Sequence, residues 1–347
     1  MNHIVIYGAG AIGATVGGWL YPHHPSVTLL ARGEHAERMK KDGLVIRLKG
    51  GKADPLPIRA PIITGMYEEP LASLLIIAVK NYGLEAACQE ISGLLGSDIT
   101  VVGLQNGVEN QAILPRYFER VVYGVVWYNA WIESPGVVAA NRPGPIILGV
   151  TTDDPEEIAL RDETAALLSR GMSIETTDRI VDAVHSKLIL NLTNAVLTLV
   201  GHGFREIASI RDLKHIMVSS LLEGIDIVAR AGYSEHRFPK SPSWGLLRLS
   251  ARLPEFISDM IFKNDLKTVD LNSMGQDMLQ IGRADTELES LTGYILDLAD
   301  QYKMPAPVNR TIYELCKREF GKPTFTPMSE SEVWELIRER IKMGDDS

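Results

Sequence analysis

One lysine and three uncharged polar residues recur at helical spacing in a largely apolar stretch between positions 179 and 200. Lys187, Asn191, Asn194 and Thr198 are separated by four, three and four positions. On an α-helix, which turns by about 100° per residue, they fall within an arc of about 60°. Such a stripe either faces water or lines a polar cavity, and a single lysine followed by amides favours the cavity.

A lysine in a polar cavity suits the reduction of a carbonyl group. As hydride reaches the carbonyl carbon, negative charge develops on the oxygen, where an ammonium group can stabilise and protonate it. Desolvation lowers the pKa of a lysine and so eases that transfer. We therefore take Lys187 as a candidate proton donor, and Asn191, one turn away, as a group that could hold the substrate.

A glycine-rich turn at the start of the chain is the second pattern with chemical meaning. It follows an apolar run and has the form G-x-G-x-x-G between a predicted strand and a predicted helix. The first glycine allows the tight turn, the second lets the backbone approach a pyrophosphate, and the third lets the helix pack closely. An ordinary glycine-rich turn is the alternative to a dinucleotide site. The predicted cofactor-binding residues here are Gly8, Ala9, Gly10, Ala11, Ile12 and Gly13.

The end of the second predicted strand, residues 27–32, indicates which dinucleotide binds. An NAD site usually places Asp or Glu there to hold the ribose 2′-hydroxyl, whereas an arginine suits the 2′-phosphate of NADP. The strand ends in Arg32, and the nearest acid, Glu34, follows two residues later. The sequence thus favours NADP(H), with a solvated charge at the strand end as the alternative for Arg32.

Two further apolar runs, 74–79 and 99–104, end in polar residues. Lys80 follows the first run, and Gln105-Asn106-Gly107 follows the second. Short continuous runs of Val, Ile and Leu indicate strands covered on both faces of a parallel sheet, and ligands bind beyond the carboxyl ends of such strands. Lys80 and Asn106 are therefore expected near the nicotinamide, although a solvated lysine and a simple Asn-Gly turn stay open.

These patterns predict two domains. Residues 1–178 alternate strands with helices and predict an α/β fold, a Rossmann-type doubly wound parallel sheet. Residues 179–347 predict an all-helical C-terminal domain. Further strands are expected over 121–131 and 136–150, and helices over 179–200, 205–232, 273–303 and 330–343, the last with Ser329 and Glu332 spaced as a capping box.

The composition argues against several classes of function. A net charge of −9 argues against a nucleic-acid or anionic-membrane surface. Cys88 and Cys316 match no metal or redox spacing, and no metal site is expected. No apolar run reaches the roughly 18 residues of a membrane span, and the early first strand leaves no room for a signal peptide. We expect a cytoplasmic enzyme that acts on a small molecule, with a homodimer left open.

In this order, the motifs resemble those of the ketopantoate reductases (2-dehydropantoate 2-reductases). Residues 272–294 add Asn-Ser-Met-Gly-Gln-Asp, then Arg283, then Thr-Glu-Leu-Glu and Gly-Tyr. This is similar to the family's Ser-Met-x-Gln-Asp, Arg and Thr-Glu run, and the likeness covers about residues 1–320. It implies NADPH-dependent reduction of a 2-oxo acid to a 2-hydroxy acid, with the conversion of 2-dehydropantoate to pantoate in pantothenate biosynthesis as the expected reaction.

The resemblance also implies a role for each matching residue. Lys187 would be the general acid, and Glu287 a carboxylate that contacts the substrate hydroxyl or Lys187. Glu287 could instead be a solvated helix charge, as could the neighbouring Glu289. The residues implied to bind substrate or to lie near the nicotinamide are Lys80, Asn106, Asn191 and Ser273, and Ala130 would offer a backbone contact to the cofactor.

The chain departs from the family pattern in three places. Ala195 stands where the family often has an asparagine, and Asn194, on the Lys187 face, could replace that asparagine in the substrate site. The spacing from Ser273 to Glu287 is about two residues longer than usual, and residues 241–263 form an expanded stretch. These departures leave two alternatives open: a related hydroxy-acid dehydrogenase with another substrate, or a non-catalytic NADP-binding sensor or scaffold.

Overall fold

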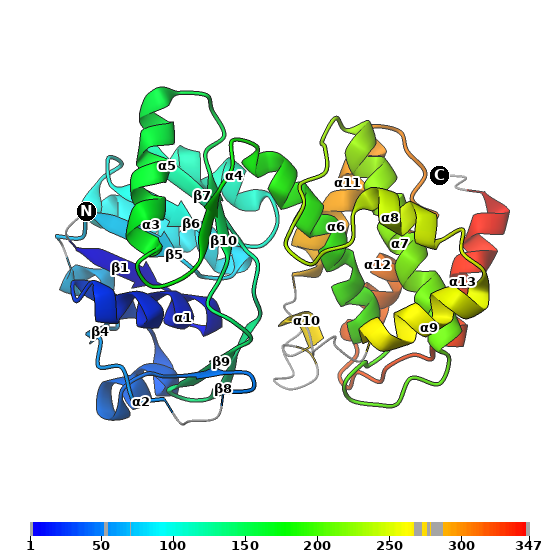
Figure 1. Cartoon of the computed structure of the whole chain (residues 1–347), viewed down its shortest axis with the longest axis horizontal. Coiled ribbons are helices and arrows are strands. Elements are labelled where there is room, and N and C mark those ends of the chain that lie inside the picture. The colour runs from blue at the N-terminus through cyan, green and yellow to red at the C-terminus, as the bar shows by residue number, and fades with distance from the viewer. Residues whose placement is uncertain are drawn as a thin grey trace. The chain divides into compact units, whose positions relative to one another are not determined.

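The computed structural model describes residues 3–51, 55–69, 71–266, 273–275, 278 and 287–344, without the side chains of Phe256, Ile257, Ile261, Asp265 and Ser273. The chain forms two compact units, an N-terminal unit (Met1–Val184) and a C-terminal unit (His185–Ser347). Each unit has its own hydrophobic core. Figure 1 shows strands and helices in the first unit and packed helices in the second.

An eight-stranded sheet forms the centre of the N-terminal unit, in the order β11-β10-β7-β6-β5-β1-β2-β4. Neighbouring strands run parallel, except that β10 is antiparallel to β7. The central strands are buried runs of Val, Ile and Leu, as the sequence predicts for strands covered on both faces. The strands are β1 (Ile4–Tyr7), β2 (Val27–Leu30), β4 (Ile62–Ile63), β5 (Leu74–Ile77), β6 (Thr100–Gly103), β7 (Arg120–Val126), β10 (Ile146–Gly149) and β11 (Ile174–Thr176).

Helices connect these strands, and a small second sheet lies against one of the helices. The helices are α1 (Ala11–Leu20), α2 (Gly33–Asp42), α3 (Leu84–Leu95), α4 (Glu109–Ile113) and α5 (Pro155–Leu168). The second sheet has the order β3-β9-β8, with β3 (Val45–Leu48), β9 (Val137–Ala140) and β8 (Ala130–Ser134). Helix α1 contacts β1 and β2 of the large sheet and β8 and β9 of the small one, so the two sheets enclose it (Figure 1).

The prediction of single strands over 121–131 and 136–150 is wrong. Each stretch divides into two strands, of which β7 and β10 stay in the large sheet while β8 and β9 form the small sheet. Polar contacts lie at the break, where the Asn129 N–H donates to the Asn141 side chain (3.0 Å) and Arg142 Nη2 donates to the Trp127 carbonyl (2.8 Å). The apolar pattern indicated strands, but it did not show where they change sheets.

Helices build the described part of the C-terminal unit. Helix α7 (Ile210–Arg230) contacts α8, α9, α11, α12 and α13, so it lies at the centre of the unit. The bounds of the helices around it are α6 (Ile180–Leu199), α8 (Trp244–Ser250), α9 (Glu255–Leu266), α10 (Ser273–Gly275), the π-helix η6 (Glu289–Gly293), α11 (Tyr294–Gln301), α12 (Pro307–Phe320) and α13 (Glu330–Met343).

Two predicted helix ends are confirmed in this unit. Helix α6 ends before Gly201, whose φ of +69° suits the left-handed residue that closes a helix. Helix α13 has the predicted bounds, and the Ser329 hydroxyl accepts a 3.2 Å hydrogen bond from the Glu332 N–H.

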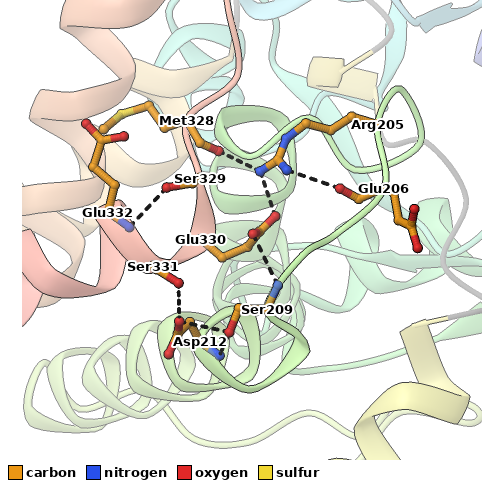
Figure 2. Close-up of polar contacts among 9 residues, drawn as sticks. All are labelled: Arg205, Glu206, Ser209, Asp212, Met328, Ser329, Glu330, Ser331 and Glu332. Atoms are coloured by element: carbon orange, nitrogen blue, oxygen red, sulfur yellow. Dashed lines mark hydrogen bonds and ion pairs between the residues drawn. The ribbon is translucent and has the colours of Figure 1, made fainter.

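An ion pair with a buried carboxylate fixes the start of α13 to the loop that follows α6 (Figure 2). The Glu330 side chain is fully buried, and Arg205 Nη2 donates to its carboxylate at 2.6 Å and to the Met328 carbonyl at 2.7 Å. On the other side of the carboxylate, the Ser209 N–H lies 3.4 Å away. The Met328 N–H also donates to the Leu199 carbonyl at 3.0 Å, so this junction holds the last turn of α6 as well.

We expect Arg205→Met to reduce the free energy of unfolding by about 3–5 kcal/mol, because it leaves a buried carboxylate without its counter-charge. Urea denaturation followed by circular dichroism measures the change. Arg340→Met is the control, since Arg340 pairs with the half-exposed Glu314 and should cost less than about 1 kcal/mol. Equal losses for the two variants would contradict a structural role for the buried pair.

Candidate active site

The glycine-rich turn between β1 and α1 has the geometry of an anion-binding turn. Gly8 has φ +97°, which an L side chain rarely adopts, and a Cβ on Gly13 would lie 2.2 Å from the Gly8 carbonyl oxygen. A Cβ on Gly10 would meet nothing within 4 Å, so the turn is open above this residue. Gly10 is also the N-cap of α1, and no side chain caps the helix. The predicted turn is thus present, with helix N–H groups available to a phosphate.

The strand predicted to end in Arg32 ends at Leu30, so Arg32 lies two residues beyond β2, where it is the N-cap of α2, and its side chain is largely exposed. Its Nη2 lies 3.5 Å from Glu90 Oε2 of α3, and the Tyr7 hydroxyl donates to the same carboxylate oxygen at 2.5 Å. Sequence reasoning missed Glu90, since nothing in the local pattern of α3 marks this residue. An exposed guanidinium held by one carboxylate remains able to reach a phosphate.

Lys80 and Asn106 occupy equivalent positions on neighbouring strands. Ile77 at the end of β5 pairs with Gly103 at the end of β6, and each polar residue follows three positions later. The structure therefore places both at the carboxyl edge of the sheet, as predicted. Both side chains are half-buried.

Two buried amides join the loops that carry these residues, and sequence reasoning assigned them no role. The Asn81 side chain donates to the Asn106 carbonyl at 2.7 Å. Gln105 Nε2 donates to the carbonyls of Ile77 (2.8 Å) and Val79 (3.2 Å). Their position directly beside Lys80 and Asn106, after buried strands, is the signal that could have indicated them.

Ala130 begins β8 in the small sheet and pairs with Ala140. It follows the carboxyl end of β7 by four residues, so the chain passes the same edge of the large sheet shortly before it. Its backbone contact to a cofactor stays a prediction.

In the C-terminal unit, the polar stripe of α6 does not face open solvent. Lys187, Asn191 and Asn194 are half-buried and Thr198 is buried, while their apolar neighbours on α6 belong to the core. This agrees with a stripe that lines a polar site better than with an ordinary surface helix. Ala195 is fully buried in the core. By helical spacing, position 195 lies at the edge of the stripe, whereas Asn194 lies within it.

Lys187 has an electrostatic environment that suits a proton donor. Burial lowers the pKa of its ammonium group to about 8, and the charge of Glu287 acts in the opposite direction. Glu287 is itself only 7% exposed. Glu289, in contrast, is exposed and pairs with Lys317 at 2.9 Å, so the structure separates the two glutamates that the sequence left open.

Some predicted features lie outside the described part of the chain. The Ser273 side chain and Arg283 lie outside the described residues, although the Ser273 backbone begins α10. Within the residues that the structure describes, no group of three or more His, Cys, Asp or Glu side chains could hold a metal ion. Among the same residues, no helix has the length and apolar character needed to cross a membrane.

The family profile decides the classification. The profile described as ketopantoate reductase PanE/ApbA matches residues 4–153, and its C-terminal counterpart matches residues 179–319. The chain belongs to the ketopantoate reductase family. As a member of this family it is an oxidoreductase that acts on a CH–OH group, which confirms the resemblance stated from the motifs. Helix α13 lies beyond the matched region.

Individual relatives agree with the family. The 2-dehydropantoate 2-reductase of Pyrococcus horikoshii is 28% identical over 320 residues, which cover 90% of this chain and 96% of the relative. A ketopantoate reductase structure from Ralstonia eutropha has a TM-score of 0.71 at 22% identity, covering 97% and 99% of the two chains. A D-mandelate dehydrogenase with NADH and anilino(oxo)acetate has a TM-score of 0.74 at 22% identity, covering 92% and 98%. At these identities the two structures support the fold alone, which is the predicted one.

Proposed function

We propose that this protein reduces 2-dehydropantoate to pantoate with NADPH. The observation that carries the proposal is Lys187, a lysine with a pKa lowered to about 8 by burial, on a helix whose stripe also presents Asn191 and Asn194. Glu287, nearly buried, supplies the opposing charge. These residues lie within the region that the family profile matches.

The glycine-rich turn and Arg32 fit the pyrophosphate and the 2′-phosphate of NADPH. The open space above Gly10 leaves room for the pyrophosphate, and the uncapped start of α1 offers N–H donors to it. The exposed Arg32 guanidinium can form a charge-assisted hydrogen bond with the 2′-phosphate. When bound, NADPH supplies the hydride that reduces the keto carbon.

Lys187 completes the reduction in this proposal by donating a proton to the keto oxygen. With a pKa near 8, most of its side chains are protonated at neutral pH, yet the proton leaves more easily than from an ordinary lysine. Glu287 keeps Lys187 charged within protein surroundings that disfavour charge. Asn191 and Asn194 are assigned to bind the substrate through their amides, which adds no further charge to the site.

The proposed function is tested by measuring NADPH oxidation with 2-dehydropantoate and a panel of other 2-oxo acids, both branched and aromatic. We expect the highest kcat/KM with 2-dehydropantoate. A higher value with another acid would keep the reaction class and change the substrate. Tight NADPH binding without turnover of any 2-oxo acid would contradict the proposal and favour a sensor or scaffold.

Arg32→Ala is expected to weaken NADPH binding by about 10- to 100-fold and to leave NADH binding nearly unchanged, since a charge-assisted hydrogen bond contributes about 1.5–3 kcal/mol. Fluorescence titration with each cofactor measures both dissociation constants. Arg47→Ala is the matched control, because Arg47 is also an exposed arginine paired with one glutamate, Glu133, at 2.9 Å. Equal losses for NADPH and NADH in Arg32→Ala would show that Arg32 does not recognise the 2′-phosphate.

A further inference from the structure

A cluster of three rings lies beside the residues assigned to proton transfer, and the proposed chemistry does not use it. The His185 ring is 1% exposed and stacks on Tyr233, with centroids 3.6 Å apart and planes inclined by 17°. His185 Nε2 and the Tyr294 hydroxyl oxygen are 2.9 Å apart, within hydrogen-bonding distance.

The hydrogen bond joins the same two segments that carry Lys187 and Glu287. His185 precedes Lys187 by two residues on α6, and Tyr294 follows Glu287 by seven residues at the start of α11. The Leu291 N–H donates to the Glu287 carbonyl at 3.1 Å, so the backbone of Glu287 is already part of the first turn that leads to Tyr294. A shift of Tyr294 against α6 would therefore move Glu287 against Lys187.

The intervening turn is a π-helix, η6, and not a regular α-helical turn. Single π-helical turns are often found at functional sites, where the extra residue changes the direction of side chains. Within this turn the Glu289 side chain pairs with Tyr313 and Lys317. The widened turn thus separates an exposed ion pair from the nearly buried Glu287.

We propose that the hydrogen bond between His185 and Tyr294, with Tyr233 stacked on the histidine, is a positioning strut that keeps Glu287 at its working distance from Lys187. Neither His185 nor Tyr294 is assigned a contact with substrate, so both are positioning residues. Their effect on turnover rests on the proposed function, whereas their effect on Lys187 does not.

The chemical state of the two groups fits this role. Burial, followed by the neighbouring Tyr233, raises the pKa of the Tyr294 hydroxyl above its ordinary value, so it stays protonated and can donate to the imidazole. Of the titratable groups on these segments, Glu287 acts on the charge of Lys187, whereas His185 and Tyr294 pair with each other and Tyr233 packs against the histidine.

The decisive variants are Tyr294→Phe and the double variant His185→Phe/Tyr294→Phe. The single variant leaves a buried imidazole nitrogen without its partner and should destabilise the fold. The double variant replaces both partners by apolar rings, so no imidazole nitrogen is left unpaired. The contact between Tyr294 and Tyr233 is lost in the single and the double variant alike. A role confined to core stability therefore predicts that the double variant recovers wild-type behaviour, and a positioning role predicts that it does not.

The measurement is the pKa of Lys187, obtained by NMR titration of protein carrying lysine labelled with ¹³C at Cε, in the absence of substrate. Lys187→Arg assigns the resonance. We expect the pKa of Lys187 to fall in Tyr294→Phe and in the double variant. The fall should have the same direction as in Glu287→Gln and be smaller. Adding Tyr294→Phe to Glu287→Gln should cause no further fall, because the charge that the strut positions is already gone.

Turnover gives a second readout. We expect kcat in the double variant to fall by about 2- to 10-fold, the equivalent of one hydrogen bond, with a smaller change in KM. His215→Phe is the matched control, since His215 also stacks on an aromatic ring, that of Trp334, and it should change neither quantity. An unchanged pKa of Lys187 in both strut variants would overturn the inference. Absence of turnover in the wild type would instead overturn the proposed function, and the NMR titration would still test the strut.

Discussion

Replacement of Lys187 by alanine is expected to lower kcat by about 10²- to 10⁴-fold, the usual range for a lost general acid. The reason is the combination of burial and a pKa near 8, which gives this lysine a proton that can be transferred at neutral pH. Steady-state kinetics with NADPH and the preferred 2-oxo acid measure the loss. The dissociation constant of NADPH should change little, because the glycine-rich turn and Arg32 lie in the N-terminal unit.

Two further variants separate this role from a structural one. Lys214→Met also removes a nearly buried lysine, one that pairs with Asp259 and Ser258, and should reduce stability with little change in kcat per folded molecule. Asn191→Ala should mainly raise KM and change kcat little, as expected for lost ground-state binding of the substrate. Near-wild-type turnover in Lys187→Ala would remove the centre of the mechanism and leave a nucleotide-binding fold of unassigned chemistry.

The parts of the fold that the sequence predicted are those that depend on local pattern. The strand β1, the glycine-rich turn and helix α13 follow from an apolar run, three spaced glycines and a serine cap, and the structure has them at the predicted residues. Lys80 and Asn106 could be placed together because parallel neighbouring strands end at one edge of a sheet. In these cases a few adjacent residues carry the whole signal.

The parts that escaped prediction depend on contacts between distant segments. Residues 121–150 divide between two sheets where Asn129 and Arg142 form hydrogen bonds to the opposite segment, and an apolar pattern does not encode such contacts. Glu90 acquires its place beside Arg32 only when α3 packs on the sheet. His185 has an unremarkable local sequence, and its partner Tyr294 is 109 positions away. Pairings of this kind require the folded chain.

Glu287→Gln is expected to reduce turnover in a strongly pH-dependent way. Glu287 raises the pKa of Lys187 against the effect of burial, so the neutral amide should let that pKa fall below its value of about 8. A nearby opposite charge commonly shifts a pKa by about one to three units. A fall of one or two units would leave about a tenth or a hundredth of Lys187 protonated at pH 8, and lower kcat there by about 5- to 50-fold.

The sign of the effect distinguishes this account from a general loss of structure. In the proposed mechanism Lys187 acts as an acid, so activity is expected below its pKa and lost above it. The basic limb of the kcat profile should therefore move to lower pH in Glu287→Gln. At a pH well below the shifted value, Lys187 regains its proton and most of the activity lost through its titration should return. Glu289→Gln is the matched control, because Glu289 is exposed and paired with Lys317, and its profile should coincide with that of the wild type. A uniform loss at every pH in Glu287→Gln would show that Glu287 contributes through substrate binding or folding, and not through the charge state of Lys187.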